Sequence, residues 1–482
     1  MLVAVVTGAF MASVAGAHTY SYLGYDTRLI DSGKTAGTIL NPEGKGDVLI
    51  CPFYDVRVIN GRAQDNYFAI INENMSAIVR EGQVSHQGVA AKLRFRDWDK
   101  SEEVFDIDIW LSDNDVWVGV LTRNPSPPSG NGLTKLTSPD YVIIDDSSTS
   151  FTISKTTAVS TGYDFDSRYV PGGSLNTKAP PTGFTAADLT NMGYFEIIGE
   201  ERTYTTATVP ASGPITVGRI LSGTWDCPNS LSAYVYIVRV ADGTSMAYNC
   251  TAIANFRRDN YVLYDAPGGT LPTLAQCEDG LDQLEFELSK ARVYQGYSIE
   301  SSVNAQFSLI ITLPTKHFHF VGRPTYTSPH TPPFTSIHAN DGEAVGVTIF
   351  DRDEHTAPTG FTSPQSETQY SLPWEVNVIG LYPTAPTMPA FGSRNNVAWS
   401  TGTFQAGWVW VDLYNDIHYV DHLRFGHLGL SFWGYNGLPA ISLALQEFQN
   451  LTLTPAGYYG DILPAFYEVD WTGLAGRGHP TY

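Results

Sequence analysis

The sequence predicts a mainly β protein, built from two or three antiparallel β-sandwich domains of the Ig-like or jelly-roll-like kind, with one amphipathic helix near residues 274–292. Three observations lead to this fold class. Short segments rich in alternating apolar residues recur along the chain, and 44 Gly and 29 Pro separate them. No repeat of about 20 to 50 residues is present, which disfavours a solenoid or propeller. The length of 482 residues exceeds what one hydrophobic core usually serves.

The order of these segments suggests domain boundaries. We expect a signal peptide over 1–17 and an N-terminal β-sandwich over 18–158, which ends before a loop rich in Pro and Gly. A middle β-rich region over 159–325 contains the helix. A C-terminal β-sandwich occupies 326–482.

The clearest element is a hairpin within residues 88–121. Its first strand alternates apolar and basic residues, and its return strand alternates apolar and acidic ones. A register that pairs Arg94 with Asp106 and Lys92 with Asp108 also pairs Leu93 with Ile107 and Phe95 with Phe105. We therefore expect one buried apolar face, formed by Leu93, Phe95, Phe105 and Ile107, and a solvent-facing side that carries Arg94 and Asp106.

Further strands are predicted from short apolar runs bounded by turn residues. In the N-terminal part they are 47–54, 67–71, 115–121, 141–144 and 151–153. In the middle they are 194–198, 234–240, 247–254, 303–313 and 316–321. In the last third they are 344–350, 374–379, 407–413, 428–433 and 441–448.

One segment has helical rather than strand periodicity. An apolar stripe at spacings of three and four predicts the helix over 274–292, packed on a sheet; it consists of Leu274, Cys277, Leu281, Leu284, Leu288 and Ala291.

Residues 1–17 are apolar and small and end in Ala15-Gly16-Ala17, a pattern typical of a signal peptide that lacks its basic start. A buried first helix or strand is the alternative. No later stretch has the length of a membrane-spanning helix. We therefore expect a secreted, extracellular or cell-surface protein without a transmembrane segment in the mature chain.

Four cysteines, Cys51, Cys227, Cys250 and Cys277, lack the spacing of zinc or thioredoxin-like motifs. In an oxidising compartment an even number permits disulfides. Cys227, Cys250 and Cys277 lie close to one another in the sequence, so we expect a disulfide among them rather than one to Cys51; the pairing is left open.

Residues 18–25 form an aromatic, nearly uncharged segment that contains Tyr20, Tyr22, Leu23 and Tyr25. Such a segment suits β-pairing, either within its own domain or with a neighbouring copy. If it is donated to a neighbour, it mediates assembly.

Two sets of residues are candidate metal ligands. His317 and His319 share one side of a predicted strand, and His418 and His422 lie in a second segment rich in Asp, which together suggest a transition-metal site if the segments meet. Asp113 and Asp115 follow a strand and could bind Ca²⁺, although a solvated turn also favours Asp. Calcium is the more plausible of the two cofactors, and neither is assured.

The net charge of −21 argues against nucleic acid as a partner, because an acidic surface repels phosphate. No nucleophile, P-loop or dinucleotide motif is present. Among ten Trp and 27 Tyr, exposed rings could stack on sugars, although in β-sandwiches such rings more often belong to the core.

Four phrases resemble segments of uncharacterised exported proteins of environmental Gram-negative bacteria: EVFDIDIWLSDNDVW, ADGTSMAYNCTAIANF, LIITLPTKHFHF and VGVTIFDRDE. The resemblance implies a secreted or surface β-rich protein and no particular reaction.

The leading functional hypothesis is an extracellular or cell-surface structural subunit, an S-layer or filament protomer that assembles with copies of itself and with surface glycans as possible partners. The alternatives are a secreted metal-dependent or carbohydrate-active enzyme and a carbohydrate-binding protein.

Overall fold

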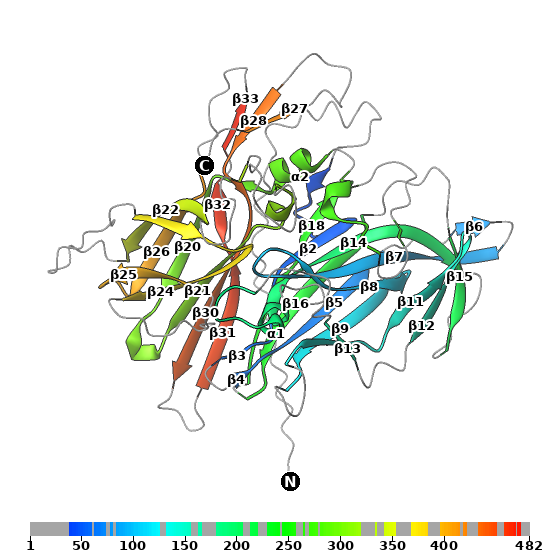
Figure 1. The fold of residues 1–482 in the computed structure, drawn as a ribbon, viewed down its shortest axis with the longest axis horizontal. Coiled ribbons are helices and arrows are strands. Elements are labelled where there is room, and N and C mark those ends of the chain that lie inside the picture. The colour runs from blue at the N-terminus through cyan, green and yellow to red at the C-terminus, as the bar shows by residue number, and fades with distance from the viewer. Residues whose placement is uncertain are drawn as a thin grey trace, which may run out of the picture. The chain divides into compact units, whose positions relative to one another are not determined.

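Antiparallel β-strands make up most of the computed structural model (Figure 1). The structure describes residues 38–59, 62–73, 78–80, 83–125, 132–155, 162–165, 180–205, 213–219, 229–241, 243–256, 264–265, 269–277, 280–319, 333–334, 342–352, 368–383, 396–414, 418–421, 432–450, 457–468 and 470–473. The mainly β class with several antiparallel sheets is confirmed, and the finer expectation of sandwich domains stays a prediction.

The largest sheet has ten strands. In spatial order they are β1 (Ile39–Leu40), β18 (Thr251–Ala254), β2 (Val48–Asp55), β14 (Met192–Thr205), β15 (Ile215–Arg219), β12 (Ser150–Lys155), β11 (Tyr141–Asp146), β8 (Glu103–Ser112), β7 (Gln83–Asp97) and β6 (Ile78–Arg80). Strand β14 also pairs with β7 along most of its length. This extra pairing closes β7, β8, β11, β12, β15 and β14 into a six-stranded barrel, where sandwich domains were expected.

The barrel has its own small apolar core. Its members are Ala90, Trp110, Tyr141, Ile143, Phe151, Ile153 and Val217, with Tyr264 packed against them. The indole Nε1 of Trp110 donates a hydrogen bond of 2.8 Å to Thr203 Oγ1 on β14. Both faces of β7 and β8 are therefore covered, because the barrel interior lies on the side opposite the main core.

The predicted hairpin is present as β7 and β8, with the predicted register: Lys92 is opposite Asp108, Leu93 opposite Ile107, Arg94 opposite Asp106 and Phe95 opposite Phe105. Leu93 and Phe95 are fully buried, while Phe105 and Ile107 are partly buried against the same core. The expected solvent-facing side is wrong. Arg94 is fully buried and Asp106 is only partly exposed, because barrel closure and residues 269–272 cover the charged side.

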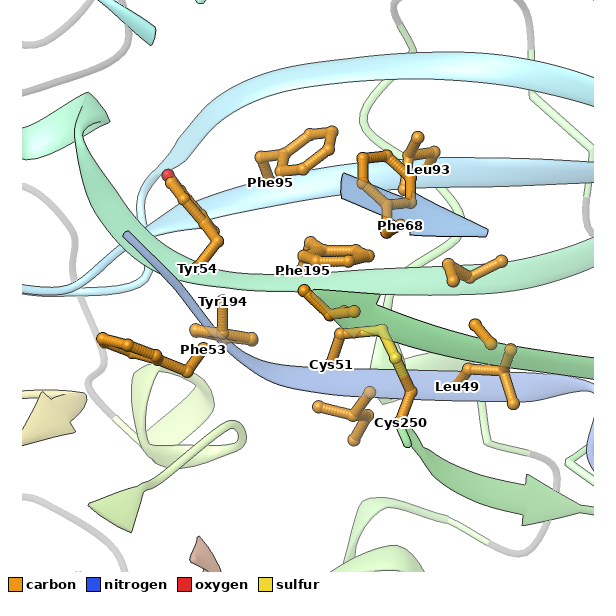
Figure 2. Close-up of a cluster of buried hydrophobic side chains, with 14 of the residues drawn as sticks. Leu49, Cys51, Phe53, Tyr54, Phe68, Leu93, Phe95, Tyr194, Phe195 and Cys250 are labelled. Atoms are coloured by element: carbon orange, nitrogen blue, oxygen red, sulfur yellow. A yellow bond between two sulfur atoms is a disulfide. The ribbon is translucent and has the colours of Figure 1, made fainter. Parts of the chain in front are cut away.

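A six-stranded sheet contributes to the main core together with the ten-stranded sheet. Its order is β13 (Tyr163–Asp164), β10 (Thr134–Thr137), β9 (Asp115–Arg123), β5 (Asp65–Asn72), β16 (Leu231–Arg239) and β17 (Thr244–Asn249). Figure 2 shows part of this core, in which Phe68, Phe95 and Phe195 gather near the disulfide of Cys51 and Cys250. The centroid of the Phe195 ring lies 5.0 Å from that of Phe68 and 5.1 Å from that of Phe95.

Two five-stranded sheets build the second main cluster of buried residues. One has the order β23 (Thr368–Leu372), β22 (Glu343–Asp351), β26 (Ala406–Asp412), β20 (Arg292–Ser298) and β32 (Phe466–Glu468). The other has the order β25 (Asn396–Gly402), β24 (Val376–Pro383), β21 (Gln306–Thr312), β30 (Ile441–Asn450) and β31 (Gly457–Pro464), with β24 and β25 parallel. Val347, Val409 and Val411 from the first sheet share their core with Leu309 and Ile379 from the second.

The predicted helix over 274–292 is too long. The structure has a 3-10 turn η3 (Leu274–Gln276), then helix α2 (Leu281–Leu288), then β19 (Ser289–Lys290) and β20. Gly280, with φ +94°, separates the first two, a backbone conformation that suits glycine. The apolar stripe is nevertheless buried, except for the partly buried Leu281.

The smaller elements are α1 (Ala186–Thr190), η4 (Ser301–Val303), η5 (Lys316–His319), β3 (Val58–Ile59), β4 (Arg62–Ala63), β27 (His418–Asp421), β28 (Phe432–Asn436), β29 (Leu438–Pro439) and β33 (Asp470–Gly473). The predicted strand at 316–321 is wrong, because η5 occupies its described residues. Residues Thr38–Tyr482 form one compact unit. The barrel combines strands from 18–158 with strands from 159–325. Of the helices described, none has both the length and the apolar character needed to cross a membrane.

Candidate functional site

The outer side of the sheet that contains β22, β26, β20 and β32 carries a group of aromatic side chains. We call Phe350, Trp408, Trp410, Tyr294 and Phe466 the aromatic face. Phe466 is 61% exposed and Trp408 37% exposed, and the other three are half-buried. Exposed apolar patches of this kind mark binding surfaces more often than scattered single residues do.

Strand register brings these rings together. Trp408 lies opposite Phe350 on β22 and Gly296 on β20, and Trp410 lies opposite Tyr294, which in turn lies opposite Phe466. The rings of Phe350 and Trp408 stack with centroids 3.9 Å apart, and those of Tyr294 and Phe466 have nearly parallel planes 12° apart. Gly296 adds no side chain between them, so the face is open at this position.

An ion pair borders the aromatic face. Arg292 and Asp412 lie opposite each other on β20 and β26, and the Arg292 Nε donates a hydrogen bond to an Asp412 carboxylate oxygen. The guanidinium carbon of Arg292 lies 4.5 Å from the centroid of the Trp410 ring, within the range of a cation–π contact. The face therefore combines apolar rings with charged hydrogen-bonding groups at one border.

The opposite side of the same strands explains why these rings point outward. Val409 and Val411 alternate with Trp408 and Trp410 along β26, and both valines are fully buried. A strand directs alternate side chains to opposite sides, so the tryptophans must leave the core that the valines fill. This alternation of valine and tryptophan is the signal in the sequence that could have located the site. The sequence-based expectation was instead that aromatic residues belong to the core more often than to the surface.

A second polar constellation lies inside the barrel. Lys92 Nζ is 2.8 Å from Asp108 Oδ1 and 3.3 Å from Asp106 Oδ2. The side chains of Lys92 and Asp108 are fully buried, and that of Asp106 is 11% exposed. Burial raises the pKa of Asp108 to about 6, although Lys92 opposes this shift.

Glu200 belongs to the same constellation. It lies at a bulge of β14, between the residues that pair with Ala91 and Ala90 of β7. It is buried, and among the described residues neither of its carboxyl oxygens has a hydrogen-bond partner. Burial, and then the charge of Asp108, raise its pKa well above the usual range, which favours the protonated form of this carboxyl.

Of the four histidines predicted to bind a metal, the structure describes the side chains of His317 and His319 only. His317 and His319 lie on η5, and His319 Nε2 is 2.5 Å from Glu285 Oε1 of α2. Burial raises the pKa of Glu285. His418 begins β27, but its side chain and all of His422 lie outside the described residues. No group of three or more His, Cys, Asp or Glu side chains suited to a metal occurs in the described part of the chain. The transition-metal site stays a prediction.

Of the predicted calcium ligands, Asp113 lies in the turn between β8 and β9, and Asp115 is the first residue of β9. Asp115 Oδ2 accepts hydrogen bonds from the amide and the hydroxyl of Ser112, at 3.1 and 3.0 Å. Asn114 adopts a left-handed conformation with φ 53° beside Asp113. The carboxylate of Asp115 thus stabilises its own hairpin turn, and the calcium site remains a prediction.

A disulfide is present, but its pairing differs from the expected one. Cys250 is joined to Cys51, 199 residues away, and their Cα atoms are 4.4 Å apart. The reason is register: β18 pairs with β2 so that Thr251 lies opposite Ile50, which places Cys250 beside Cys51. Cys277 is buried, with its Sγ 3.3 Å from Thr38 Oγ1, and Cys227 lies outside the described residues.

The residues predicted to mediate assembly, Tyr20, Tyr22, Leu23 and Tyr25, also lie outside the described residues, as does the expected signal peptide. Comparison of the chain with protein-family models, with curated proteins and with solved structures gives no match. The aromatic face and the buried constellation are therefore interpreted from their own geometry.

Proposed function

We propose that the protein is a secreted or cell-surface carbohydrate-binding protein and that the aromatic face is its ligand site. The observation that supports this proposal is the gathering of five rings on the outer side of one sheet, bordered by Arg292 and Asp412. The C–H groups of a pyranose ring pack on the negative face of an aromatic ring, while the hydroxyl groups of the sugar need charged or polar partners nearby.

The charge of the chain supports a neutral glycan over other ligands. A net charge of −21 repels nucleic acid and acidic polymers, whereas a neutral sugar meets no such repulsion. The Cys51–Cys250 disulfide agrees with an oxidising compartment, where extracellular glycans occur. The S-layer or filament hypothesis stays a prediction, because the segment expected to mediate assembly, residues 18–25, lies outside the described residues.

The test is retention of the purified chain on insoluble polysaccharides, for example cellulose, chitin, xylan and mannan. We expect at least one of them to bind the wild type. Trp408→Ala and Phe466→Ala should each weaken binding by about tenfold, which corresponds to a ring contact worth ~1.4 kcal/mol. Tyr459→Ala is the matched control, because Tyr459 is 57% exposed on β31, in the other five-stranded sheet; its binding should not change.

Three outcomes would overturn the proposal. The first is that no polysaccharide retains the wild type, and the second is that Trp408→Ala binds as well as the wild type does. The third is a concentration-dependent dimer, measured by sedimentation, that Trp408→Ala abolishes. In that case a second copy of the chain covers the aromatic face.

A further inference from the structure

The buried constellation inside the barrel has a geometry suited to a covalent reaction within the chain. Lys92 and Asp108 lie directly opposite each other on β7 and β8, with Nζ and Oδ1 2.8 Å apart and both side chains fully buried. Reacting groups held this close in a folded chain reach effective concentrations far above those of free solutes. Glu200, on the strand that flanks β7 on its other side, is a buried carboxyl without a hydrogen-bond partner among the described residues.

We propose that Lys92 and Asp108 become joined by an amide bond, formed by the folded chain without another protein, and that Glu200 transfers protons in this reaction. This assigns a modification site to the interior of the barrel and is independent of the carbohydrate-binding function.

The reaction needs no oxidant or other co-reactant. A proton first passes from the Lys92 ammonium to the Asp108 carboxylate, which gives a neutral amine and a neutral acid. Nζ then bonds to Cγ of Asp108, and one Cγ–O bond breaks. The departing oxygen keeps the acid proton and leaves as water, and the second proton of that water comes overall from the amine. Glu200 carries out this transfer: it donates its own proton to the oxygen and takes the amine proton from Nζ, so it ends protonated as it began.

The surroundings favour the neutral form of the two acids, whereas Lys92 has to give up its proton for the reaction. A buried ion pair is costly to desolvate, and a neutral amide in its place removes two buried charges. Burial raises the pKa of Asp108 and of Glu200, so both accept protons readily. Burial also lowers the pKa of Lys92, but the acidic side chains of Glu200, Asp108 and Asp106 outweigh this effect and leave it raised. We therefore expect a slow reaction that follows folding.

Asp108 rather than Asp106 is the partner for two reasons. Its oxygen is nearer to Lys92 Nζ, 2.8 Å against 3.3 Å, and it is fully buried whereas Asp106 is partly exposed. The remaining charges nearby have other partners: Arg94 Nε is 2.8 Å from Glu103 Oε2, and Arg219 binds Glu201 at 2.8 Å. Tyr264 packs against the same core, and burial raises the pKa of its hydroxyl further above the usual range.

Intact-mass measurement of the reduced, denatured chain tests the proposal. After incubation of the folded wild type we expect a mass one water molecule below that of the reduced chain. Peptide mapping should find a cross-linked pair of peptides that contain Lys92 and Asp108. Chain kept unfolded in denaturant should retain its full mass. Lys92→Met and Asp108→Ala should retain the full mass of their sequences, and Glu200→Gln should lose water at least tenfold more slowly.

Asp106→Asn is the matched control, because it removes the other carboxylate beside Lys92. This variant should still lose water, because the bond forms at Asp108; a bond to the new amide at position 106 would release ammonia instead. Full mass in the folded wild type, water loss confined to one linear peptide, or a bond to Asp106 would overturn the assignment. A Glu200→Gln variant that reacts as fast as the wild type would remove Glu200 from the reaction. If a variant does not fold, the mass and peptide map of the wild type still decide whether the bond exists.

Discussion

Several charged residues in this chain are buried, and the immediate neighbours of each one determine its pKa. Lys290 on β19 is 6% exposed, its Nζ lies 4.1 Å from the centroid of the Tyr467 ring, and its described hydrogen bond goes to the Ser289 carbonyl. Burial lowers its pKa to about 8, although the charge of Glu287 opposes the shift. The folded chain therefore holds this ammonium at a cost.

This cost predicts a specific pH dependence. Between about pH 8 and pH 10.5 the unfolded chain binds more protons at Lys290 than the folded chain does, so the contribution of Lys290 to stability increases as pH rises through this window. Lys290→Met should be more stable than the wild type at pH 7, by on the order of 3 kcal/mol, and should lose this advantage by pH 10. Urea unfolding at both pH values measures the difference. Lys135→Met is the control, and an advantage of equal size at both pH values for Lys290→Met would contradict the prediction.

At the scale of elements, the hairpin of β7 and β8 shows how far a local pattern reaches. Alternation predicted its register pair by pair, because successive side chains of a strand point to opposite sides and a slip of one residue would reverse them all. Helix α2 shows where such a pattern fails to predict the length of an element. Its apolar stripe is buried as expected, yet Gly280 and the extended backbone at Ser289 confine the helix to eight residues.

The hairpin makes a quantitative prediction at Phe95. Its ring lies between those of Phe165 and Phe195, with centroids 4.8 and 5.1 Å away, and it is fully buried. Phe95→Ala should lower the free energy of unfolding by about 3 to 5 kcal/mol, because a cavity replaces the ring. Ile144→Ala, at a position on β11 that is 49% exposed, should change it by less than ~0.5 kcal/mol. Denaturant unfolding compares the two, and equal losses would mean that the register assigns the wrong side to the core.

At the scale of the whole molecule, the Cys51–Cys250 disulfide joins β2 to the start of β18 across 199 residues of sequence. A link across so long a loop restricts the unfolded chain strongly. The double variant Cys51→Ala/Cys250→Ala should lower the unfolding free energy by about 2 to 5 kcal/mol. Non-reducing peptide mapping should recover the two cysteine peptides as one species. Recovery of a Cys250–Cys277 species instead would contradict the structure and restore the pairing expected from sequence proximity.

The sequence by itself determined the mainly β class, most strand positions and the pairing within the hairpin, because these depend on the spacing of apolar residues over a few positions. Only the tertiary structure decided whether the second side of a strand is covered. Lys92 and Arg94 are buried because β14 closes the barrel, about a hundred residues further along the chain. The same holds for Trp408, which is exposed because other strands fill the core that Val409 enters. Alternation shows which side chains share a side, but burial depends on what a distant segment places against that side.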